Sequence, residues 1–392
     1  MNKLLKKGCF LGIAAAALLG KIIAEKTVTV SAVEADSKII SQSVYKVSDY
    51  NINNAGNDCT NELQTLIDQV YSSGGGTIEF ETGIYAFTSV NLRSNVSFEG
   101  QGIGNTTLKR LNGDNTDGAF IYIPTYCSGV TVKDLGIWGD KENDALETDG
   151  IKFQDQNTGS FEGDKFDYAK ETASMISSDV ERTYKHALIN NVYVFGFTGN
   201  GYYIGKVNYA VTMRDFTAYN NNKCGLYNVS SDNIFDGCYL ESNGSHGLYN
   251  LGGNNKFSNV KSIWNGTLDH SAWGINNVSS RCQFSNVEAQ DNWCNGINIS
   301  GNDNSFINIL SDTNGYMYGG SAEAQDCILI RVEGERNRVI GNCAQYNTQY
   351  GPIAKYAVVM ENCIDCRIDV TVENGCSTDG SILDETQVYT IG

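Results

Sequence analysis

Three series of residues recur through the middle of this sequence with nearly the same spacing. A Phe or Met at the head of a short strand-like segment recurs in steps of 22, 22, 27 and 22 residues, at Met213, Phe235, Phe257, Phe284 and Phe306. A Gly series takes steps of 24, 22, 27 and 22, at Gly201, Gly225, Gly247, Gly274 and Gly296. An Asn series takes steps of 22, 22, 27 and 22, at Asn221, Asn243, Asn265, Asn292 and Asn314. The shared long step shows that all three belong to one repeat.

A period of about 22 residues without a helical pattern inside it is typical of one coil of a parallel β-solenoid. Successive coils would stack about 4.8 Å apart. The Asn series then predicts a ladder of side-chain amides at one turn, and the Phe series predicts a stack of rings in the core. We therefore expect an all-β fold, a parallel β-solenoid.

Residues 61–71 carry a different pattern, the apolar stripe of an amphipathic helix. Its members are Leu63, Leu66, Ile67, Val70 and Tyr71, and three glycines at 74–76 end it. We expect this helix to cap the solenoid, with residues 43–112 forming the cap and the first coils.

Length and charge exclude several classes of function. The chain has 392 residues, of which 41% are hydrophobic and 19% charged, so it is globular rather than disordered. Its net charge of −17 disfavours nucleic acid and anionic lipid as partners. Because repetitive β proteins of this size form one body, we expect a single domain over residues 36–392.

The first 35 residues resemble a secretory signal peptide. Lys3, Lys6 and Lys7 precede an apolar run at 9–20, and small residues ending at Ala32 or Ala35 offer cleavage sites. The run is too short to span a bilayer. We expect a secreted, extracellular protein with no membrane association after cleavage, although an uncleaved anchor stays open.

The 12 cysteines are too dispersed for a small disulfide scaffold, and we interpret most of them as buried hydrophobes. Cys363 and Cys366 have the spacing of a zinc knuckle, but no second pair accompanies them. We expect no metal site there.

Several N-terminal motifs resemble the pectate-lyase-like superfamily of right-handed parallel β-helix proteins, which includes polygalacturonase-related proteins, phage tail spikes and inulin fructotransferases. These motifs are Val47-Ser-Asp-Tyr, Gly74-Gly-Gly-Thr-Ile-Glu-Phe, Gly83-Ile-Tyr, Asn95-Val-Ser-Phe and Gly100-Gln-Gly-Ile-Gly. The resemblance covers residues 43–375. It implies that the chain acts on, or binds, a polysaccharide lying across the exterior of the helix, and it leaves a homotrimer open.

Aligning the repeats places Lys133, Arg214 and Asp236 in one outward column, with Asp215 beside it. Arg214, Asp215 and Asp236 could supply an acid, a base and a cation for cleaving a glycosidic bond, with Lys133 contacting the substrate. The alternative is a solvated face with ordinary ion pairs.

The repeat is interrupted over residues 138–187 by an acidic stretch, interpreted as an inserted loop that walls a groove or as a flexible acidic loop. Within it, Thr148-Asp149-Gly150 is similar to a polygalacturonase motif, and Ser245-His246-Gly247 is similar to that family's His-Gly motif. The resemblance implies a catalytic carboxylate at Asp149 and an assisting His246. However, the partner Asp-Asp pair is replaced by Gly199-Asn200, so both residues also fit a purely repetitive role.

Tyr203, Tyr227 and Tyr249 occupy the same place in three consecutive coils. An outward aromatic column offers faces for sugar rings, or it stabilises the solenoid unaided.

The chain's charge favours a neutral glycan unless Ca²⁺ bridges carboxylates or the groove is locally basic. No linear Ca²⁺ motif supports a cofactor, so we expect none. We predict a polysaccharide-active enzyme of the hydrolase or lyase type that uses carboxylate acid–base chemistry. The alternatives are a non-catalytic glycan-binding or adhesion protein and a tail-spike-like depolymerase.

Overall fold

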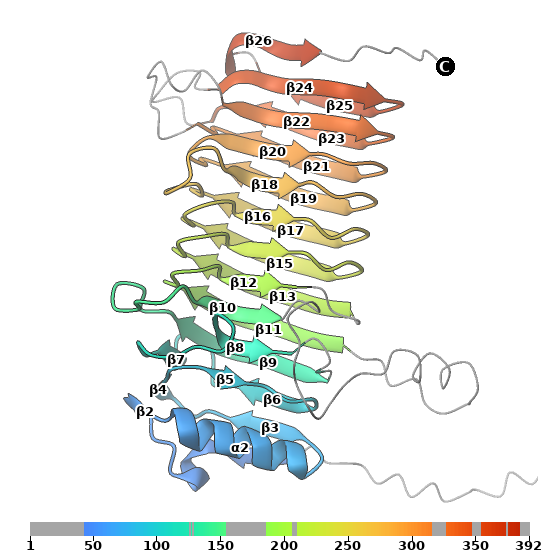
Figure 1. Cartoon of the computed structure of the whole chain (residues 1–392). Coiled ribbons are helices and arrows are strands. Elements are labelled where there is room, and N and C mark those ends of the chain that lie inside the picture. Colours follow the sequence, from blue (N-terminus) through green and yellow to red (C-terminus); the bar gives the residue numbers. More distant parts are fainter. Residues whose placement is uncertain are drawn as a thin grey trace, which may run out of the picture. The chain divides into compact units, whose positions relative to one another are not determined.

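The computed structural model describes residues 43–124, 127, 129–153, 186–205, 210–315, 327–346, 354–373 and 375–384. The predicted signal peptide and most of the acidic stretch lie outside these residues. From Ser43 onward the chain forms a stack of coils, with successive coils paired in parallel (Figure 1).

A 15-stranded sheet makes one side of the coils, and its main path runs β1-β3-β6-β9-β11-β13-β15-β17-β19-β21-β23-β25. These strands are β1 (Val44–Lys46), β3 (Gly76–Glu79), β6 (Val96–Glu99), β9 (Val130–Trp138), β11 (His186–Phe195), β13 (Ala210–Tyr219), β15 (Ile234–Glu241), β17 (Lys256–Ile263), β19 (Gln283–Gln290), β21 (Ser305–Asp312), β23 (Arg338–Ala344) and β25 (Arg367–Val372). Three further strands attach to it: β2 (Ala55–Asp58), β4 (Gly83–Phe87) and β7 (Thr106–Arg110).

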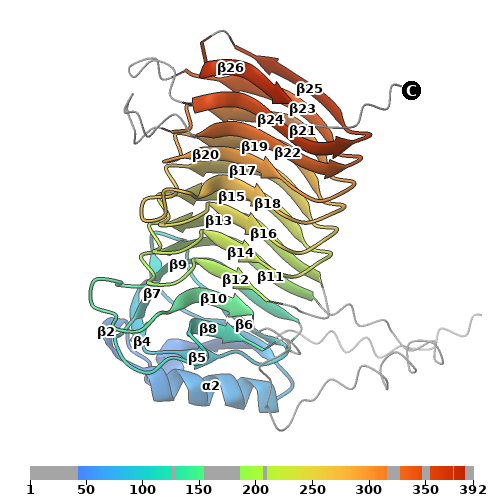
Figure 2. The same ribbon diagram turned by 45° about the horizontal axis from the view of Figure 1, so that its top comes forward.

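An 11-stranded sheet makes the other side, in the order β26-β24-β22-β20-β18-β16-β14-β12-β10-β8-β5. Its strands are β5 (Val90–Asn91), β8 (Ala119–Ile123), β10 (Asp149–Phe153), β12 (Tyr202–Ile204), β14 (Leu226–Asn228), β16 (Leu248–Asn250), β18 (Trp273–Asn277), β20 (Asn295–Ile299), β22 (Ile328–Glu335), β24 (Ala354–Ile364) and β26 (Ser377–Asp384). Figure 2, a turned view, shows how the strands of successive coils stack within each sheet. The predicted right-handed parallel β-helix is therefore confirmed.

The helix predicted over residues 61–71 is α2 (Thr60–Ser72), and it lies at the N-terminal end of the coils together with the short 3-10 helix η1 (Val47–Tyr50) (Figure 1). Its apolar stripe is buried at Leu63, Leu66, Ile67 and Val70. Because a solenoid end exposes core side chains, this helix supplies the cover that an interior coil receives from its neighbour.

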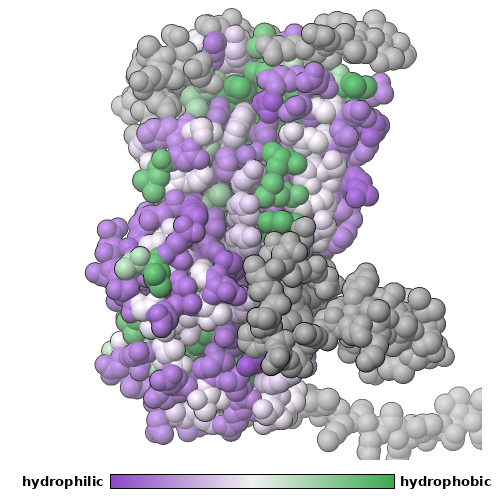
Figure 3. Space-filling model, in the orientation of Figure 1, coloured by the Kyte–Doolittle hydropathy of each residue, from purple (hydrophilic) through white to green (hydrophobic). Residues whose placement is uncertain are grey.

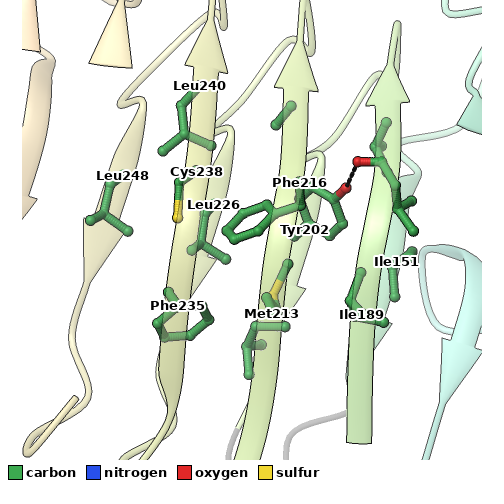
Figure 4. Packing of buried hydrophobic residues seen from close by; sticks show 14 of the residues in the cluster. Ile151, Ile189, Tyr202, Met213, Phe216, Leu226, Phe235, Cys238, Leu240 and Leu248 are labelled. Carbon is green, nitrogen blue, oxygen red and sulfur yellow. Dashed lines mark hydrogen bonds between the residues drawn. The ribbon is translucent and has the colours of Figure 1, made fainter. Parts of the chain in front are cut away.

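The core is a filled channel between the sheets. Phe235, Phe257, Phe284 and Phe306 are in direct register and buried, and successive rings stack with centroids 4.7, 4.5 and 4.1 Å apart. Met213 continues the series on the neighbouring strand, β13, where it lies beside Phe235 (Figure 4). The Phe repeat of the sequence is thus the ring stack that it predicts.

The asparagine ladder lies at one turn, as expected. Each amide of the series donates to the next Asn, and from Asn221 to Asn314 the four Nδ2–Oδ1 distances are 2.9, 2.9, 3.1 and 2.8 Å. All of these side chains are buried. Because these amides also bond backbone groups of the preceding coil, the ladder fixes the register between coils.

The exterior alternates with the interior at period 2, and the face shown in Figure 3 is mainly polar or intermediate with small hydrophobic groups. Within the described residues, no helix is long and apolar enough to cross a membrane. One strand, β10, falls inside the stretch predicted as an insertion, and it pairs with β8 and β12 as a regular part of the 11-stranded sheet. Residues 154–185 lie outside the described part of the chain.

Candidate active-site cleft

A cleft with a volume of ≈ 590 Å³ opens on the exterior of the 11-stranded sheet, over β10, β12, β14 and β16. It gathers five side chains that the sequence singles out, from segments separated by up to 100 positions in the chain. They are Asp149, Tyr203, Tyr227, His246 and Tyr249.

The tyrosines form the floor of the cleft. Tyr203, Tyr227 and Tyr249 are direct partners in the β12, β14 and β16 ladder. The first pair is stacked with ring centroids 5.1 Å apart, and the second pair meets edge to face at 5.4 Å. All three are half-buried. Burial raises the pKa of Tyr227, and the neighbouring Tyr249 raises it further, so this phenol stays protonated at neutral pH. The row offers aromatic faces together with hydroxyl donors.

Asp149, the first residue of β10, is 6% exposed. Its Oδ1 accepts the backbone N–H and the side-chain amide of Asn200 at 2.7 and 2.8 Å. Its Oδ2 lies 3.4 Å from Nζ of Lys152. Burial raises the pKa of Asp149 above its usual value, although Lys152 and Asn200 pull it down. Oδ2 is therefore the oxygen that remains for chemistry, and a cation lies beside it.

The glycine before Asn200 makes room for this carboxylate. A Cβ at Gly199 would lie 2.5 Å from Oδ1 of Asp149 and 2.8 Å from the carbonyl oxygen of Thr148. Where the polygalacturonase motif carries an Asp-Asp pair, this chain thus has a glycine that admits Asp149 and an asparagine that holds it.

His246 stands at the other end of the row, with its ring 4.7 Å from that of Tyr249. Its Nδ1 accepts the backbone N–H of Trp273 at 2.8 Å, so the neutral ring carries its proton on Nε2. The side chain of Asn276 lies 3.3 Å from Nε2. Burial lowers the pKa of His246, while Asp269 acts in the opposite direction. His246 is thus placed to donate a hydrogen bond rather than to act as a base.

Asp149 and His246 occupy the same column of the repeat, three coils apart. The register of β10 to β16 aligns Asp149 with Asn200, Cys224 and His246 in turn. In this column Asp149, Asn200 and His246 each accept the backbone N–H of the next coil. At about 4.8 Å per coil the two residues are roughly 14 Å apart, so they do not form an acid–base pair on one sugar ring.

Sequence reasoning missed the charged residues Lys152, Lys223 and Asp269 of the cleft, and it noted Asn200 only as a departure from the polygalacturonase motif. Lys152 could have been found, because it continues the tyrosine column one coil earlier, and its Nζ lies 4.9 Å from the centroid of the Tyr203 ring. Lys223 pairs with Glu147 at 2.5 Å on the rim.

Asp269 lies in the coil with the longer, 27-residue step of the repeat. Its Oδ2 accepts a hydrogen bond from Oγ of Ser245 at 3.1 Å. Burial raises its pKa, but hydrogen bonds from Ser271 and Ser245 outweigh burial and leave the pKa lowered. Nothing in the local sequence around Asp269 signals that this carboxylate lies beside Ser245 and His246.

The remaining predicted site residues lie on the 15-stranded sheet, outside the cleft. Register confirms that Lys133 and Arg214 both align with Asn190, and that Arg214 aligns with Asp236. Lys133 pairs with Glu99 at 2.9 Å. Asp236 accepts from Ser258 and Asn259 at 2.6 and 2.8 Å, which lowers its pKa.

Asp215 has a different setting from its neighbours in that group. Its φ of +49° places it at a left-handed position that recurs in every coil from β9 to β21, where Asn is the commonest residue. The structure therefore does not bring Lys133, Arg214, Asp215 and Asp236 together with Asp149 and His246.

Within the described residues, no group of three or more His, Cys, Asp or Glu side chains is arranged to hold a metal ion. The expectation that no cofactor is needed and the open choice of a homotrimer both stay predictions.

No protein-family model matches the chain. Among curated proteins, it is similar to two from Azotobacter vinelandii. Mannuronan C5-epimerase AlgE2 is 29% identical over 119 residues, which cover 26% of this chain and 12% of the relative. Alginate lyase 7 is 26% identical over 219 residues, which cover 52% of this chain and 23% of the relative. The chain thus spans less than a quarter of the length of these relatives.

Two solved structures are similar over most of the chain. The enzymatically active domain of bacteriophage CBA120 tailspike protein 2 has a TM-score of 0.65 and 17% identity, covering 90% of this chain and 54% of that one. The A-module of Azotobacter vinelandii mannuronan C-5 epimerase AlgE4 has a TM-score of 0.57 and 15% identity, covering 88% of this chain and all of that one. At these identities the likeness shows the fold alone, a right-handed parallel β-helix, which is the fold that the resemblance to the pectate-lyase-like superfamily implies.

Proposed function

We propose that this protein is a polysaccharide-active enzyme that binds its glycan along the tyrosine row of the cleft and transfers a proton with Asp149. The observation that carries the proposal is the placement of Asp149. A carboxylate that is 6% exposed, with a raised pKa and a lysine 3.4 Å from its Oδ2, stands at the end of a row of three in-register tyrosines. Buried titratable groups beside a binding surface are candidates for acid–base work.

The carboxylates of the cleft favour proton abstraction over glycoside hydrolysis. Hydrolases place two carboxyl groups roughly 5 to 9.5 Å apart across the scissile bond. Asp269 is tied to Ser245, which lies three coils from Asp149, a separation of roughly 14 Å. Glu147 is exposed and tied to Lys223, two coils from Asp149. Asp269 thus lies beyond the spacing that a hydrolase requires, and Glu147 is exposed and held in an ion pair with Lys223 rather than buried beside the tyrosine row.

The substrate class that fits best is a polymer of uronic acids. The relatives with significant sequence similarity are named as a mannuronan C5-epimerase and an alginate lyase. Although the carboxylates of Glu147, Asp149 and Asp269 also line the cleft, it carries two cations, Lys152 and Lys223, in a chain with a net charge of −17. The Lys152 ammonium can pair with the substrate carboxylate, and this pairing stabilises the negative charge that develops there when the neighbouring carbon loses its proton.

In the proposed step, Oδ2 of ionised Asp149 accepts the proton from the carbon next to the substrate carboxylate. The electron pair of the broken C–H bond moves into that carboxylate. Either a proton from water then returns to the carbon from the opposite face, which inverts it, or the electron pair expels the neighbouring glycosidic oxygen. In the second case that oxygen takes up the proton held by Asp149 or one from water, and an unsaturated sugar remains. Tyr203 and Tyr227 would hold adjacent sugars, and the His246 Nε2–H would donate to a more distant one.

The test compares Asp149→Asn with Asp215→Asn on uronate polymers of defined composition. Asn at 149 keeps the oxygen that accepts the Asn200 N–H groups, and Asn already occupies the same column at Asn200. Asn at 215 makes the same charge change at a position where other coils carry Asn. Unsaturated products would be followed by absorbance and mass spectrometry, and inversion by deuterium uptake from D₂O.

We expect turnover in the wild type and in Asp215→Asn, and none in Asp149→Asn. Equal turnover in all three proteins would refute the role of Asp149.

A non-catalytic glycan-binding protein is the second candidate, and one observation favours it. Asp149 and His246 both cap the backbone of the next coil, so their presence has a structural explanation without catalysis. Glycan binding that needs the tyrosine row, with no products and no deuterium uptake from any polysaccharide, would decide for this candidate.

We further propose that the protein is exported and acts outside the cell. The basic and apolar run at residues 3–20 supports this proposal. N-terminal sequencing of protein from the culture medium should begin at Val33 or Asp36. Retention of the intact chain in cells would contradict it.

A further inference from the structure

Cys294 and Cys327 are neighbours on adjacent coils, although 33 positions separate them in the chain. They precede β20 and β22, which pair with Ile297 opposite Ile330. The Ile328 N–H donates to Oδ1 of Asn295 at 3.0 Å, so the alignment of the two coils continues up to the cysteines. Counted back along this alignment, Cys294 lies opposite Cys327.

The two sulfur atoms are 3.0 Å apart. A disulfide has an S–S distance of about 2.05 Å, so closure requires a movement of roughly 1 Å. Neighbouring strands place paired Cα atoms about 4.8 Å apart, within the range of about 4.4 to 6.8 Å that disulfides accept. The backbone therefore already provides the separation that a disulfide needs.

We propose that Cys294 and Cys327, both thiols in this structure, form a disulfide that links two successive coils when the protein meets a small-molecule disulfide oxidant such as oxidised glutathione. This modification does not depend on the proposed enzymatic activity.

The chemistry proceeds in two exchange steps. Cys294 is half-buried whereas Cys327 is fully buried, so the Cys294 thiolate attacks the oxidant first. This step forms a mixed disulfide and releases one small thiol. The Cys327 thiolate then attacks Sγ of Cys294, forms the protein disulfide and releases the second small thiol. One oxidant is reduced to two thiols, which carry away the two protons of the cysteines.

A second cysteine pair, Cys363 and Cys366, provides an internal control for oxidation. Cys366 has its pKa lowered to about 6, chiefly by a hydrogen bond with Cys363, and it is half-buried. It is therefore expected to react with the oxidant quickly, and it serves as a positive control for oxidation. Cys366→Ser is the matched variant for Cys294→Ser, since each removes one half-buried thiol.

The experiment maps disulfides in the folded, full-length chain. Protein held with excess oxidised glutathione is alkylated, digested without reductant and analysed by mass spectrometry. The sequence between Arg281 and Arg331 contains neither Lys nor Arg, so trypsin would leave Cys282, Cys294 and Cys327 on one peptide. A protease that cleaves at acidic residues is used instead, because Asp303, Asp312 and Glu323 lie between the two cysteines.

We expect a cross-linked peptide pair containing Cys294 and Cys327, present in the wild type and in Cys366→Ser and absent from Cys294→Ser. The midpoint of thermal unfolding should rise on oxidation in the first two proteins and stay unchanged in the third. Full alkylation of Cys294 and Cys327 in wild-type protein whose Cys366 is oxidised would overturn the proposal. The proposal would also be overturned if Cys294 were cross-linked to other cysteines in the same yield as to Cys327. This result can be obtained with the wild-type protein alone.

Discussion

Asn243→Ala removes the centre of the buried asparagine ladder. Oδ1 of Asn243 accepts the backbone and side-chain N–H groups of Asn221 at 3.2 and 2.9 Å. Its Nδ2 donates to Oδ1 of Asn265 at 2.9 Å and to the carbonyl oxygen of Ala218 at 3.1 Å. A net contribution of about 1 kcal/mol for each of these bonds gives a loss of about 4 kcal/mol in the free energy of unfolding. The loss is large because the abandoned groups of Asn221 are buried away from water.

The matched control is Asn286→Gly in a second, exposed asparagine ladder. Asn286 bonds Asn259 at 3.2 Å and Asn308 at 2.8 Å, but water can replace both partners. Glycine is tolerated at this left-handed position, because Gly237 occupies it in another coil. We expect a cost below about 1 kcal/mol.

Denaturant unfolding measures the two losses, and hydrogen exchange locates them. In Asn243→Ala the amide of Asn221 should exchange faster, while amides near α2 keep their protection, because a solenoid couples mainly neighbouring coils. Equal destabilisation by both variants, or unchanged exchange at Asn221, would refute the assignment of register to this ladder.

Three further predictions concern the cleft. Folding raises the pKa of Asp149, so the stability that this group contributes to the wild type is fully present at low pH and is lost as pH rises through the folded-state pKa. Thermal unfolding should therefore show Asp149→Asn gaining stability relative to the wild type from about pH 4 upward. A stability difference that stays constant with pH would contradict the burial argument. If ionised Asp149 is the base, turnover should rise with pH over the same range, as Asp149 loses its proton. A turnover rate that falls with pH over that range would exclude this role. Tyr227→Ala should weaken glycan binding by about 0.5 to 1.5 kcal/mol, about 2- to 12-fold, in titration calorimetry, whereas Tyr239→Ala, an exposed tyrosine of the 15-stranded sheet, should bind as wild type.

The repeat period made the fold predictable from the sequence. Each of these coils places an inward-facing ring at the same position, so the phenylalanines recur at a regular spacing in the sequence. They are Phe235, Phe257, Phe284 and Phe306. The tyrosine row was predictable for the same reason, since Tyr203, Tyr227 and Tyr249 keep a constant offset from the glycine series.

The cleft itself was not predictable from spacing, because its polar groups reach it from irregular positions. Asp269 lies in the long step of the repeat, and only the fold brings it to Ser245. Lys223 meets Glu147 across 76 positions. The hypothesis on Arg214 and Asp236 placed the right residues side by side, but the sequence could not tell that Asp149, His246 and the tyrosine row share a cleft on the other sheet.

The most direct test of the proposed cleft is a crystal structure of Asp149→Asn bound to an oligouronate. We expect sugar rings on Tyr203, Tyr227 and Tyr249, with a substrate carboxylate beside Nζ of Lys152. An oligosaccharide lying instead over Arg214 and Asp236, with the tyrosine row unoccupied, would contradict it.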